Sequence, residues 1–302
     1  MTIDKKIFNS KQSDKIVDYF VKTGFCIVRG IYSSKQLKNL ENFFKKNLKK
    51  FENANVYNKY EKNIFAAAIG EIFNKNPLES YFFENKKLID LLKLFYGEDI
   101  IKIGNTRFQI NFKIDGSLDT QVKSEKQNSQ FLDIHTDYWT GTSEYSIHYW
   151  LPFFGLDKDN MLTVYPGSHL NGPFPVLNRK IDLKYDFLYE GHKLNYLKKG
   201  DLVLFHSLML HKTSGKSKKT RASLLTRFNN LHYKKTNQEF DLGFKTLSLG
   251  PLRKIIRLIG NDSLTQFRTY GGKPGIDSSI RHIYDKNQKD IKINSLIKKL
   301  QK

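Results

Sequence analysis

The spacing of apolar residues changes character near residue 101, and this change constrains the fold more than any other feature of the sequence. Before it, apolar side chains recur at helical spacing, in residues 14–23, 37–48, 64–73 and 88–95. After it come short alternating runs broken by Gly and Pro, a pattern typical of β-structure. Strands are expected at residues 106–114, 146–151, 162–165, 194–197, 201–205 and 222–228, with an earlier one at 25–29. We therefore predict a mainly β core, about residues 101–230, behind a helical cover, about residues 10–100.

Local signals sharpen several of these boundaries. Gly24 stands at the usual stop position of the first helix, and Ser33 with Gln36 forms a capping-box signal for the second. The polar stretch 115–130 is expected to be a loop, either a plain connection or a lid beside the site. We expect one domain over residues 1–233 and a C-terminal extension over 234–302, with short helices at 252–259 and 291–300.

Composition excludes several classes of protein. The net charge of +21 comes mainly from scattered Lys, whereas base and phosphate recognition favours Arg, so the charge argues against a nucleic-acid partner. The basic surface suits an anionic small-molecule substrate, or it serves solubility alone. The lone Cys26 lies in an apolar run, which predicts a buried, inert thiol and rules out a disulfide framework. Apolar stretches are too short for a membrane span and the start lacks a signal-peptide core, so we expect a cytoplasmic protein.

A His-x-Asp pair suggests a metal site. His135 and Asp137 lie two residues apart, so in an extended strand an imidazole and a carboxylate would share one face. His211 follows the expected strand 201–205, where pairing could bring it alongside. Two neutral imidazoles and one carboxylate form the facial triad that suits Fe(II). A lone His-x-Asp also occurs by chance in surface turns, and His206 competes with His211 as the third ligand.

An arginine downstream strengthens the metal interpretation. Arg221 begins an apolar strand ten residues after His211, and Ser223 lies on the same face two residues later. A guanidinium aimed into a barrel needs an anionic partner, because an unpaired buried charge is costly. A dicarboxylate cosubstrate would supply that partner.

These motifs, with others in the same order, resemble the phytanoyl-CoA dioxygenase family of 2-oxoglutarate oxygenases, which includes the ectoine hydroxylases. The resemblance runs over about residues 11–229. Beyond the metal motif and the segment from His211 to Arg221, its carriers are the following runs: Tyr19-Phe20 to Gly24-Phe25, Val28-Arg29-Gly30, Ile110-Asn111-Phe112-Lys113, Trp150, Tyr165-Pro166-Gly167-Ser168-His169, and Gly200 to His206.

The resemblance implies a double-stranded β-helix, the jelly-roll or cupin-like fold, with flanking helices. It also implies roles for individual residues. His135, Asp137 and His211 correspond to the Fe(II) ligands, and Arg221 to the residue that grips the far carboxylate of 2-oxoglutarate. Thr213 and Ser223 would add hydrogen bonds to that carboxylate, while Trp150 and Lys113 match positions near the cosubstrate. Relatives often carry Gln where this chain has Thr136, which leaves a cosubstrate role at that position open.

The activity implied by the resemblance is hydroxylation of an unactivated C–H bond in a small molecule, using O2 and 2-oxoglutarate and releasing succinate and CO2. One alternative is a halogenase on the same fold, which needs a small residue where Asp137 stands. Another is a non-catalytic binding protein on the same barrel. Four side chains near these motifs could line a substrate pocket or belong to the core: His148, Tyr138, Trp139 and Tyr145. His169 is expected to stabilise a turn.

Overall fold

Among the residues that the structure describes, most helices lie in the N-terminal third of the chain. The computed structural model describes residues 6–53, 59–113, 134–177, 180–181, 189–213, 219–234 and 242–258, with residues 236 and 239. Its helices are α1 (Ser13–Thr23), α2 (Ser34–Asn53), α3 (Lys59–Asn74), α4 (Pro77–Phe83), α5 (Lys86–Tyr96) and α8 (Pro251–Leu258), with short 3-10 helices η1 (Asp137–Thr140) and η2 (Ser168–Asn171). Within these described ranges, no helix is long and apolar enough to cross a bilayer.

The strands form two main sheets and a two-stranded ribbon. They are β1 (Phe8–Asn9), β2 (Phe25–Arg29), β3 (Ile100–Asn111), β4 (Ile147–Phe154), β5 (Leu162–Val164), β6 (Val176–Leu177), β7 (Lys180–Ile181), β8 (His192–Lys193), β9 (Leu202–His206), β10 (His211–Thr213), β11 (Arg221–Asn230) and β12 (Phe244–Thr246). The larger sheet has the order β1-β2-β9-β4-β11-β3-β12, the smaller has β10-β5-β8, and β6 pairs with β7.

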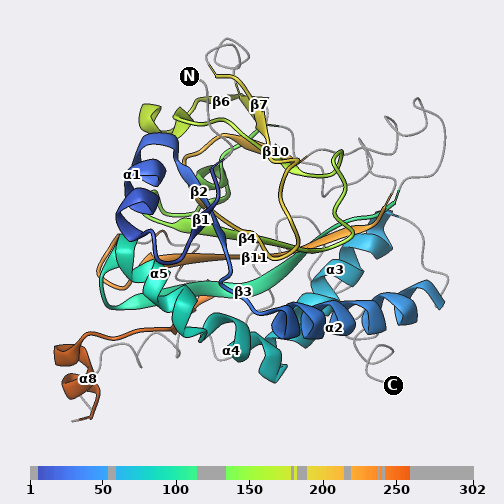
Figure 1. Cartoon of the computed structure of the whole chain (residues 1–302), viewed down its shortest axis with the longest axis horizontal. Coiled ribbons are helices and arrows are strands. Elements are labelled where there is room, and N and C mark those ends of the chain that lie inside the picture. Colours follow the sequence, from blue (N-terminus) through green and yellow to red (C-terminus); the bar gives the residue numbers. More distant parts are fainter. Residues whose placement is uncertain are drawn as a thin grey trace.

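The larger sheet crosses the middle of the molecule, with α2, α3 and α4 on one side and β10 of the smaller sheet on the other (Figure 1). This is the predicted jelly-roll with a helical cover. Strands β2, β9 and β4 of the larger sheet are buried on both faces, and they are nearly continuous apolar runs. In β2, for example, Cys26 and Val28 pack with the helices, whereas Phe25 and Ile27 pack between the two sheets. The space between the sheets is therefore where an enclosed site can form.

The first helices match their sequence signals. Gly24 adopts a left-handed φ of 82° and caps α1. Gln36 accepts the backbone N–H of Ser33 at 2.9 Å and donates its own N–H to the Ser33 hydroxyl, which completes the predicted capping box. The apolar face predicted for α2 is buried against the sheet. Cys26 is buried as predicted, and burial raises the pKa of its thiol.

Two strand predictions need correction. The run predicted at residues 106–114 is only the second half of β3, which starts at Ile100 and passes through Gly104 with φ 64°. Gly104 reads as a break in the sequence, but a left-handed glycine lets the strand bend and continue. Residues 194–197 form a turn rather than a strand. The apolar Leu194 and Leu197 are buried between the sheets, and the Leu194 N–H still donates to the Leu162 carbonyl oxygen of β5 at 2.9 Å. A buried turn has the same closely spaced apolar residues as a short strand, which explains the wrong prediction.

Segments at the edges of the fold extend what the sequence predicted. The loop expected at 115–130 and the helix expected at 291–300 lie outside the described residues, whereas the helix expected at 252–259 is α8. Beyond residue 233, where we placed the end of the domain, β12 still pairs with β3. Glu239 accepts the Ser143 N–H at 2.9 Å and the Ser146 hydroxyl at 2.8 Å. The start of the C-terminal extension thus contacts the loop between η1 and β4.

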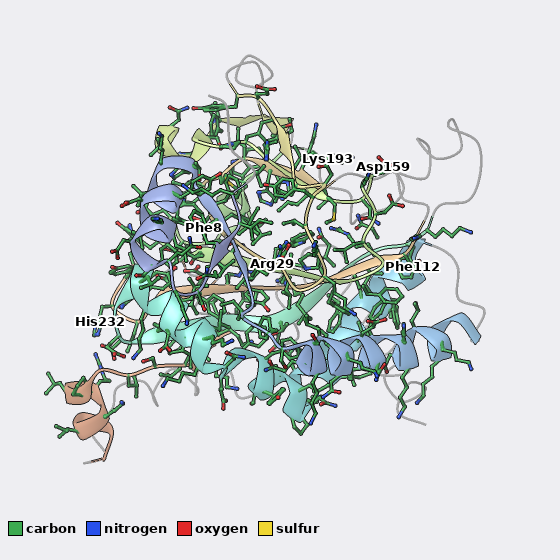
Figure 2. The ribbon with its side chains drawn as sticks, viewed as in Figure 1. Phe8, Arg29, Phe112, Asp159, Lys193 and His232 are labelled. Carbon is green, nitrogen blue, oxygen red and sulfur yellow. The ribbon has the colours of Figure 1, made fainter. Side chains whose placement is uncertain are left out.

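Surface charges are arranged as ordinary ion pairs in several places. Figure 2 labels Lys193 and Asp159 near one another, and their charged groups lie 3.6 Å apart. Arg29, labelled near the centre of the same view, donates two hydrogen bonds of 2.7 Å to the buried carboxylate of Asp201. That pair joins the end of β2 to the start of β9.

Candidate active site

Three predicted ligand residues come together beside the smaller sheet. His135 and His211 form an isolated antiparallel bridge, with backbone hydrogen bonds of 3.0 and 2.9 Å, which places their rings 4.2 Å apart. Asp137 Oδ1 lies 3.8 Å from His135 Nε2, and its Oδ2 lies 3.8 Å from His211 Nε2. One ligand atom from each residue falls within 4.8 Å of the others. The three side chains could hold one metal ion.

The backbone that presents this cluster differs from the expected strand. Thr136 is extended, with φ −113° and ψ 147°, so His135 and Asp137 point to the same side, as predicted. Asp137, however, is the first residue of η1 and not part of a strand. Thr136 points away from the cluster and is fully buried.

His206 does not join the cluster, which resolves the competition with His211. The ring of His206 packs against Phe20 and His169, and its Nδ1 accepts the backbone N–H of Leu208 at 3.2 Å. His169 lies in η2 with Nε2 3.0 Å from the Val21 carbonyl oxygen, so its side chain links η2 to α1. Neither imidazole belongs to the candidate metal group.

Two members of the cluster, His211 and Asp137, are held in the ionisation states that a divalent metal requires. Burial lowers the pKa of His211 to about 3, helped by the neighbouring His135, so this imidazole is neutral near pH 7. Burial acts against ionisation of Asp137, but interactions with the histidines, His148 first, outweigh it and hold the Asp137 pKa well below its usual range. Neutral imidazoles and an ionised carboxylate are the forms that bind metal.

Sequence reasoning did not anticipate the contact of His148 with this cluster. His148 lies on β4, and its Nδ1 is 2.7 Å from Asp137 Oδ2. The sequence suggested only a pocket or core position, because 148 carries no motif relation to 137. No local signal could reveal the contact, since it depends on how the loop after His135 folds back over β4.

Arg221 presents a second unusual feature, at the start of β11. Its side chain is fully buried, and its Nε and Nη1 have no hydrogen-bond partner among the described residues. The guanidinium lies 5.1 Å from the Trp150 ring centroid, and burial lowers its pKa to about 9. In the described part of the chain no carboxylate forms an ion pair with Arg221. A buried cation without a counter-charge fits an anionic ligand.

One side chain that the sequence analysis missed organises the surroundings of Arg221. Gln109 Oε1 accepts hydrogen bonds from Trp150 Nε1 at 3.0 Å, from Arg221 Nη2 at 3.2 Å and from the Ser223 hydroxyl at 3.4 Å. Gln109 is on β3, next to β11, so sheet register alone creates the contact. Three of the residues that the sequence suggested for cosubstrate binding, Trp150, Arg221 and Ser223, therefore donate to the same Gln109 amide oxygen.

The metal cluster and Arg221 lie on one face of β4. His148 and Trp150 are two residues apart on that strand, so their side chains point to the same face. His148 contacts Asp137, and Trp150 contacts Arg221. Trp150 packs in the apolar cluster between the two sheets, so this face lines the barrel interior.

The remaining predicted residues are placed less centrally. Thr213 is buried on β10, two residues from His211. Lys113 is exposed just after β3, and its backbone N–H donates to the Thr220 hydroxyl. Trp139 packs partly against a small apolar cluster. Tyr145 is half exposed and contacts Tyr233.

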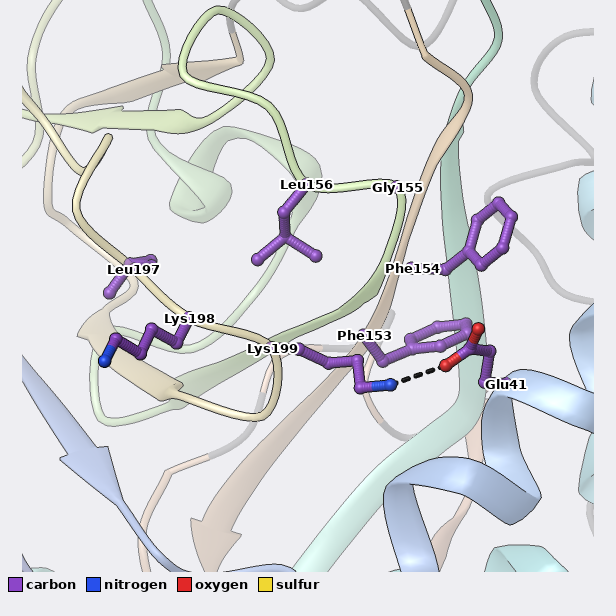
Figure 3. A pocket seen from close by; sticks show the side chains of 8 residues that line it. All are labelled: Glu41, Phe153, Phe154, Gly155, Leu156, Leu197, Lys198 and Lys199. Atoms are coloured by element: carbon purple, nitrogen blue, oxygen red, sulfur yellow. Dashed lines mark hydrogen bonds and ion pairs between the residues drawn. The ribbon is translucent and has the colours of Figure 1, made fainter. Parts of the chain in front are cut away.

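A pocket of about 390 Å³ opens at the other end of β4 and contains none of the metal-cluster residues. Figure 3 shows its lining residues: Glu41, Phe153, Phe154, Gly155, Leu156, Leu197, Lys198 and Lys199. Glu41 and Lys199 form an ion pair across it. Its lining residues include no histidine or cysteine, and the carboxylate of Glu41 is already paired with Lys199.

A jelly-roll barrel that gathers two histidines and a carboxylate near a buried arginine, with no acidic partner among the described residues, defines the class of non-haem iron, 2-oxoglutarate-dependent oxygenases. The chain belongs to the phytanoyl-CoA dioxygenase (PhyH) family, whose model matches residues 20–223. It is therefore an oxidoreductase of that class, with iron and 2-oxoglutarate as its cofactor and cosubstrate. No curated protein matches the chain significantly.

Several solved structures share the fold at low sequence identity. The chain is similar to the apo form of a non-heme monooxygenase, ThoJ, with TM-score 0.55 and 13% identity over 94% of this chain and 98% of that one. It is similar to the epimerase SnoN in complex with Fe3+, alpha ketoglutarate and nogalamycin RO, with TM-score 0.52 and 11% identity over 73% and 84%. EctD from S. alaskensis, with 2-oxoglutarate and 5-hydroxyectoine, gives TM-score 0.51 and 14% identity over 74% and 77%.

Proposed function

We propose that this protein hydroxylates an unactivated C–H bond of a small molecule, with release of succinate and CO2. In this proposal His135, Asp137 and His211 hold Fe(II), and Arg221 binds the distal carboxylate of 2-oxoglutarate, with Thr213 and Ser223 as further donors. The observation that carries the proposal is the fully buried Arg221 guanidinium, which faces the same interior as the metal cluster and has no acid beside it among the described residues.

The residues of the chain supply binding, orientation and exclusion of water. When bound, the iron and its cosubstrate supply the oxidising power for the C–H bond, whereas the protein fixes their positions. Two imidazoles and one carboxylate leave coordination positions open for 2-oxoglutarate and O2. Trp150 covers one face of the Arg221 guanidinium, and Gln109 orients its Nη2 edge. The remaining N–H groups are left to form a charge-assisted pair with a carboxylate.

Proteins with this fold catalyse different reactions, so the fold alone does not specify the reaction or the substrate. One structural neighbour is an epimerase and another is a monooxygenase. Asp137 in the metal cluster argues against halogenation, which needs an open position at that site. We propose hydroxylation, and we include carboxylated and phosphorylated metabolites in the substrate search because the net charge is +21.

The test compares the buried His211 with the partly buried His206, which lies five residues before it. We expect the purified protein to bind one Fe(II) per chain and to form succinate from 2-oxoglutarate in the presence of O2 and reductant. His211→Ala should lose the iron, and His206→Ala should keep it. A metabolite screen scored by succinate release, with a substrate-free control, would then find the substrate class. Full iron binding in His211→Ala would overturn the ligand assignment, and iron binding without any succinate release would favour a non-catalytic binding protein.

A further inference from the structure

His148 is a buried imidazole that both neighbouring strands hold in place. On β4 it pairs with Phe205 of β9 on one side and with Arg227 of β11 on the other. Its ring stacks on Phe205, with centroids 5.3 Å apart and 21° between the planes. The residue is 8% exposed. A side chain fixed in this way can set the position of whatever it contacts.

The contact is with one oxygen of the carboxylate in the metal cluster. His148 Nδ1 lies 2.7 Å from Asp137 Oδ2, which is hydrogen-bond distance. The ring nitrogens of His135 and His211 lie farther away, each 3.8 Å from an oxygen of that carboxylate. His148 is thus the histidine that holds Asp137 Oδ2, and Oδ1, on the side of His135, is left for the metal.

Asp137 needs such a partner because of where it stands. It opens a four-residue 3-10 helix and is not held within a strand, so the sheet does not fix its side chain. A carboxylate free to rotate can bind a metal through either oxygen or through both, and binding through both would occupy a position that 2-oxoglutarate or O2 requires. Groups that hydrogen-bond to ligating carboxylates orient them and tune the metal.

We propose that His148 is a positioning residue for the metal centre, in which its Nδ1–H donates to Asp137 Oδ2 and leaves Oδ1 to coordinate the ion. This inference rests on the proposed function, because it presumes that Asp137 is a metal ligand. His148 itself lies outside the group of residues whose ligand atoms converge. Its Nε2 is buried and makes no hydrogen bond within the described residues, so Nδ1 is the ring atom that acts.

The experiment measures Mn(II) affinity by calorimetric titration of the apo protein, without any catalytic turnover. His148→Leu should weaken Mn(II) binding about 10- to 100-fold, the range typical for lost outer-sphere partners of metal ligands. His148→Asn should retain most of the affinity, because its amide nitrogen can stand near the place of Nδ1. The matched control is His169→Leu, which removes another histidine that is 8% exposed but lies outside the cluster, and which should leave the affinity unchanged. Thermal unfolding verifies that each variant is folded.

A double-mutant cycle separates positioning from direct ligation. If His148 acts through Asp137, His148→Leu should cause little further loss of affinity in an Asp137→Ala background. An undiminished loss in that background would mean that His148 binds the ion directly, and it would overturn the proposal. Wild-type affinity in folded His148→Leu, or an Asn variant as weak as the Leu variant, would also overturn it. Wild-type affinity in Asp137→Ala would instead overturn the metal site of the proposed function.

Discussion

Two of the buried cations of this protein, Lys102 and Arg221, lie in different regions and are treated in opposite ways. On the helix-covered side, Lys102 of β3 is 3% exposed and its Nζ lies 3.0 Å from Glu79 Oε1 of α4, while Lys245 lies 3.2 Å from Glu79 Oε2. Between the sheets, Arg221 is fully buried and no acid accompanies it in the described chain. Burial lowers the pKa of both cations. The difference is that Lys102 has an acidic partner within the fold, whereas Arg221 has none among the described residues.

This contrast separates structure from function more clearly than burial alone. Lys102 also donates to the Gly104 carbonyl oxygen at 3.0 Å and to the Thr106 hydroxyl at 3.2 Å, so the fold itself supplies hydrogen-bond acceptors for its ammonium group. Within the described residues, the Arg221 guanidinium donates only through Nη2, to Gln109. A fold tolerates an uncompensated buried charge only at a cost, so such a charge points to a ligand that arrives later. Variants in both regions test this distinction.

The largest effect is expected at Asp137. Asp137→Ala should abolish 2-oxoglutarate turnover and weaken iron binding, because the anionic ligand balances part of the ion's charge. Asp137→Glu should also fail, since a ligand displaced by about 1 Å can cost about 100-fold in rate. Succinate release measures both. Wild-type turnover in Asp137→Ala without added halide would contradict its role as a ligand, and turnover restored by chloride would indicate a halogenase-like site.

In the helix-covered region, the expected effect is on stability. Glu79→Ala should lower the free energy of unfolding by about 3 to 5 kcal/mol, because it leaves Lys102 buried without its partner. The double variant Lys102→Met with Glu79→Leu should recover most of this loss, since apolar replacements of a buried ion pair are often neutral. Urea denaturation measures both effects. If the single and double variants were equally unstable, the pairing of Lys102 would not explain its tolerance.

Arg221 should show the reverse pattern, with a loss of binding in place of a loss of stability. Arg221→Ala should weaken 2-oxoglutarate binding by about 2 to 5 kcal/mol, the usual cost of truncating one partner of a buried charge pair. Iron binding should remain nearly intact. The control is Lys102→Met, which removes a buried cation from the other region and should leave the 2-oxoglutarate requirement unchanged. An unchanged requirement in Arg221→Ala would show that the carboxylate is held elsewhere.

The smallest effect concerns His206, a partly buried titratable group that belongs to neither region. Burial, with smaller contributions from His169 and His148, lowers its pKa from 6.5 to about 4. As pH falls from 6.5 toward 4, the unfolded chain takes up this proton before the folded one, so stability decreases over that window. The loss should be on the order of 2 to 3 kcal/mol. His206→Gln should flatten the dependence of unfolding free energy on pH; equal slopes in both proteins would contradict the shift.

Much of the fold was determined by local sequence patterns. Helical spacing and capping signals specify α1, α2, α3 and α5 because these patterns depend only on neighbouring residues. Alternating apolar runs likewise mark most strands of the core. Predictions from these patterns were wrong at Gly104, where a strand continues through a glycine, and at residues 194–197, where a buried turn resembles a strand.

The candidate site residues could also be predicted from the sequence, because His135, Asp137, His211 and Arg221 belong to motifs with a fixed order. The side chains that contact these residues could not be predicted from the sequence. Gln109 meets Arg221 across 112 residues of sequence, and His148 meets Asp137 only because η1 folds back over β4. Both contacts depend on sheet register and loop path, which arise from packing between distant segments and leave no periodic trace in the chain. The sequence determined which groups we propose to carry the chemistry, and the tertiary structure decided which side chains hold those groups in position.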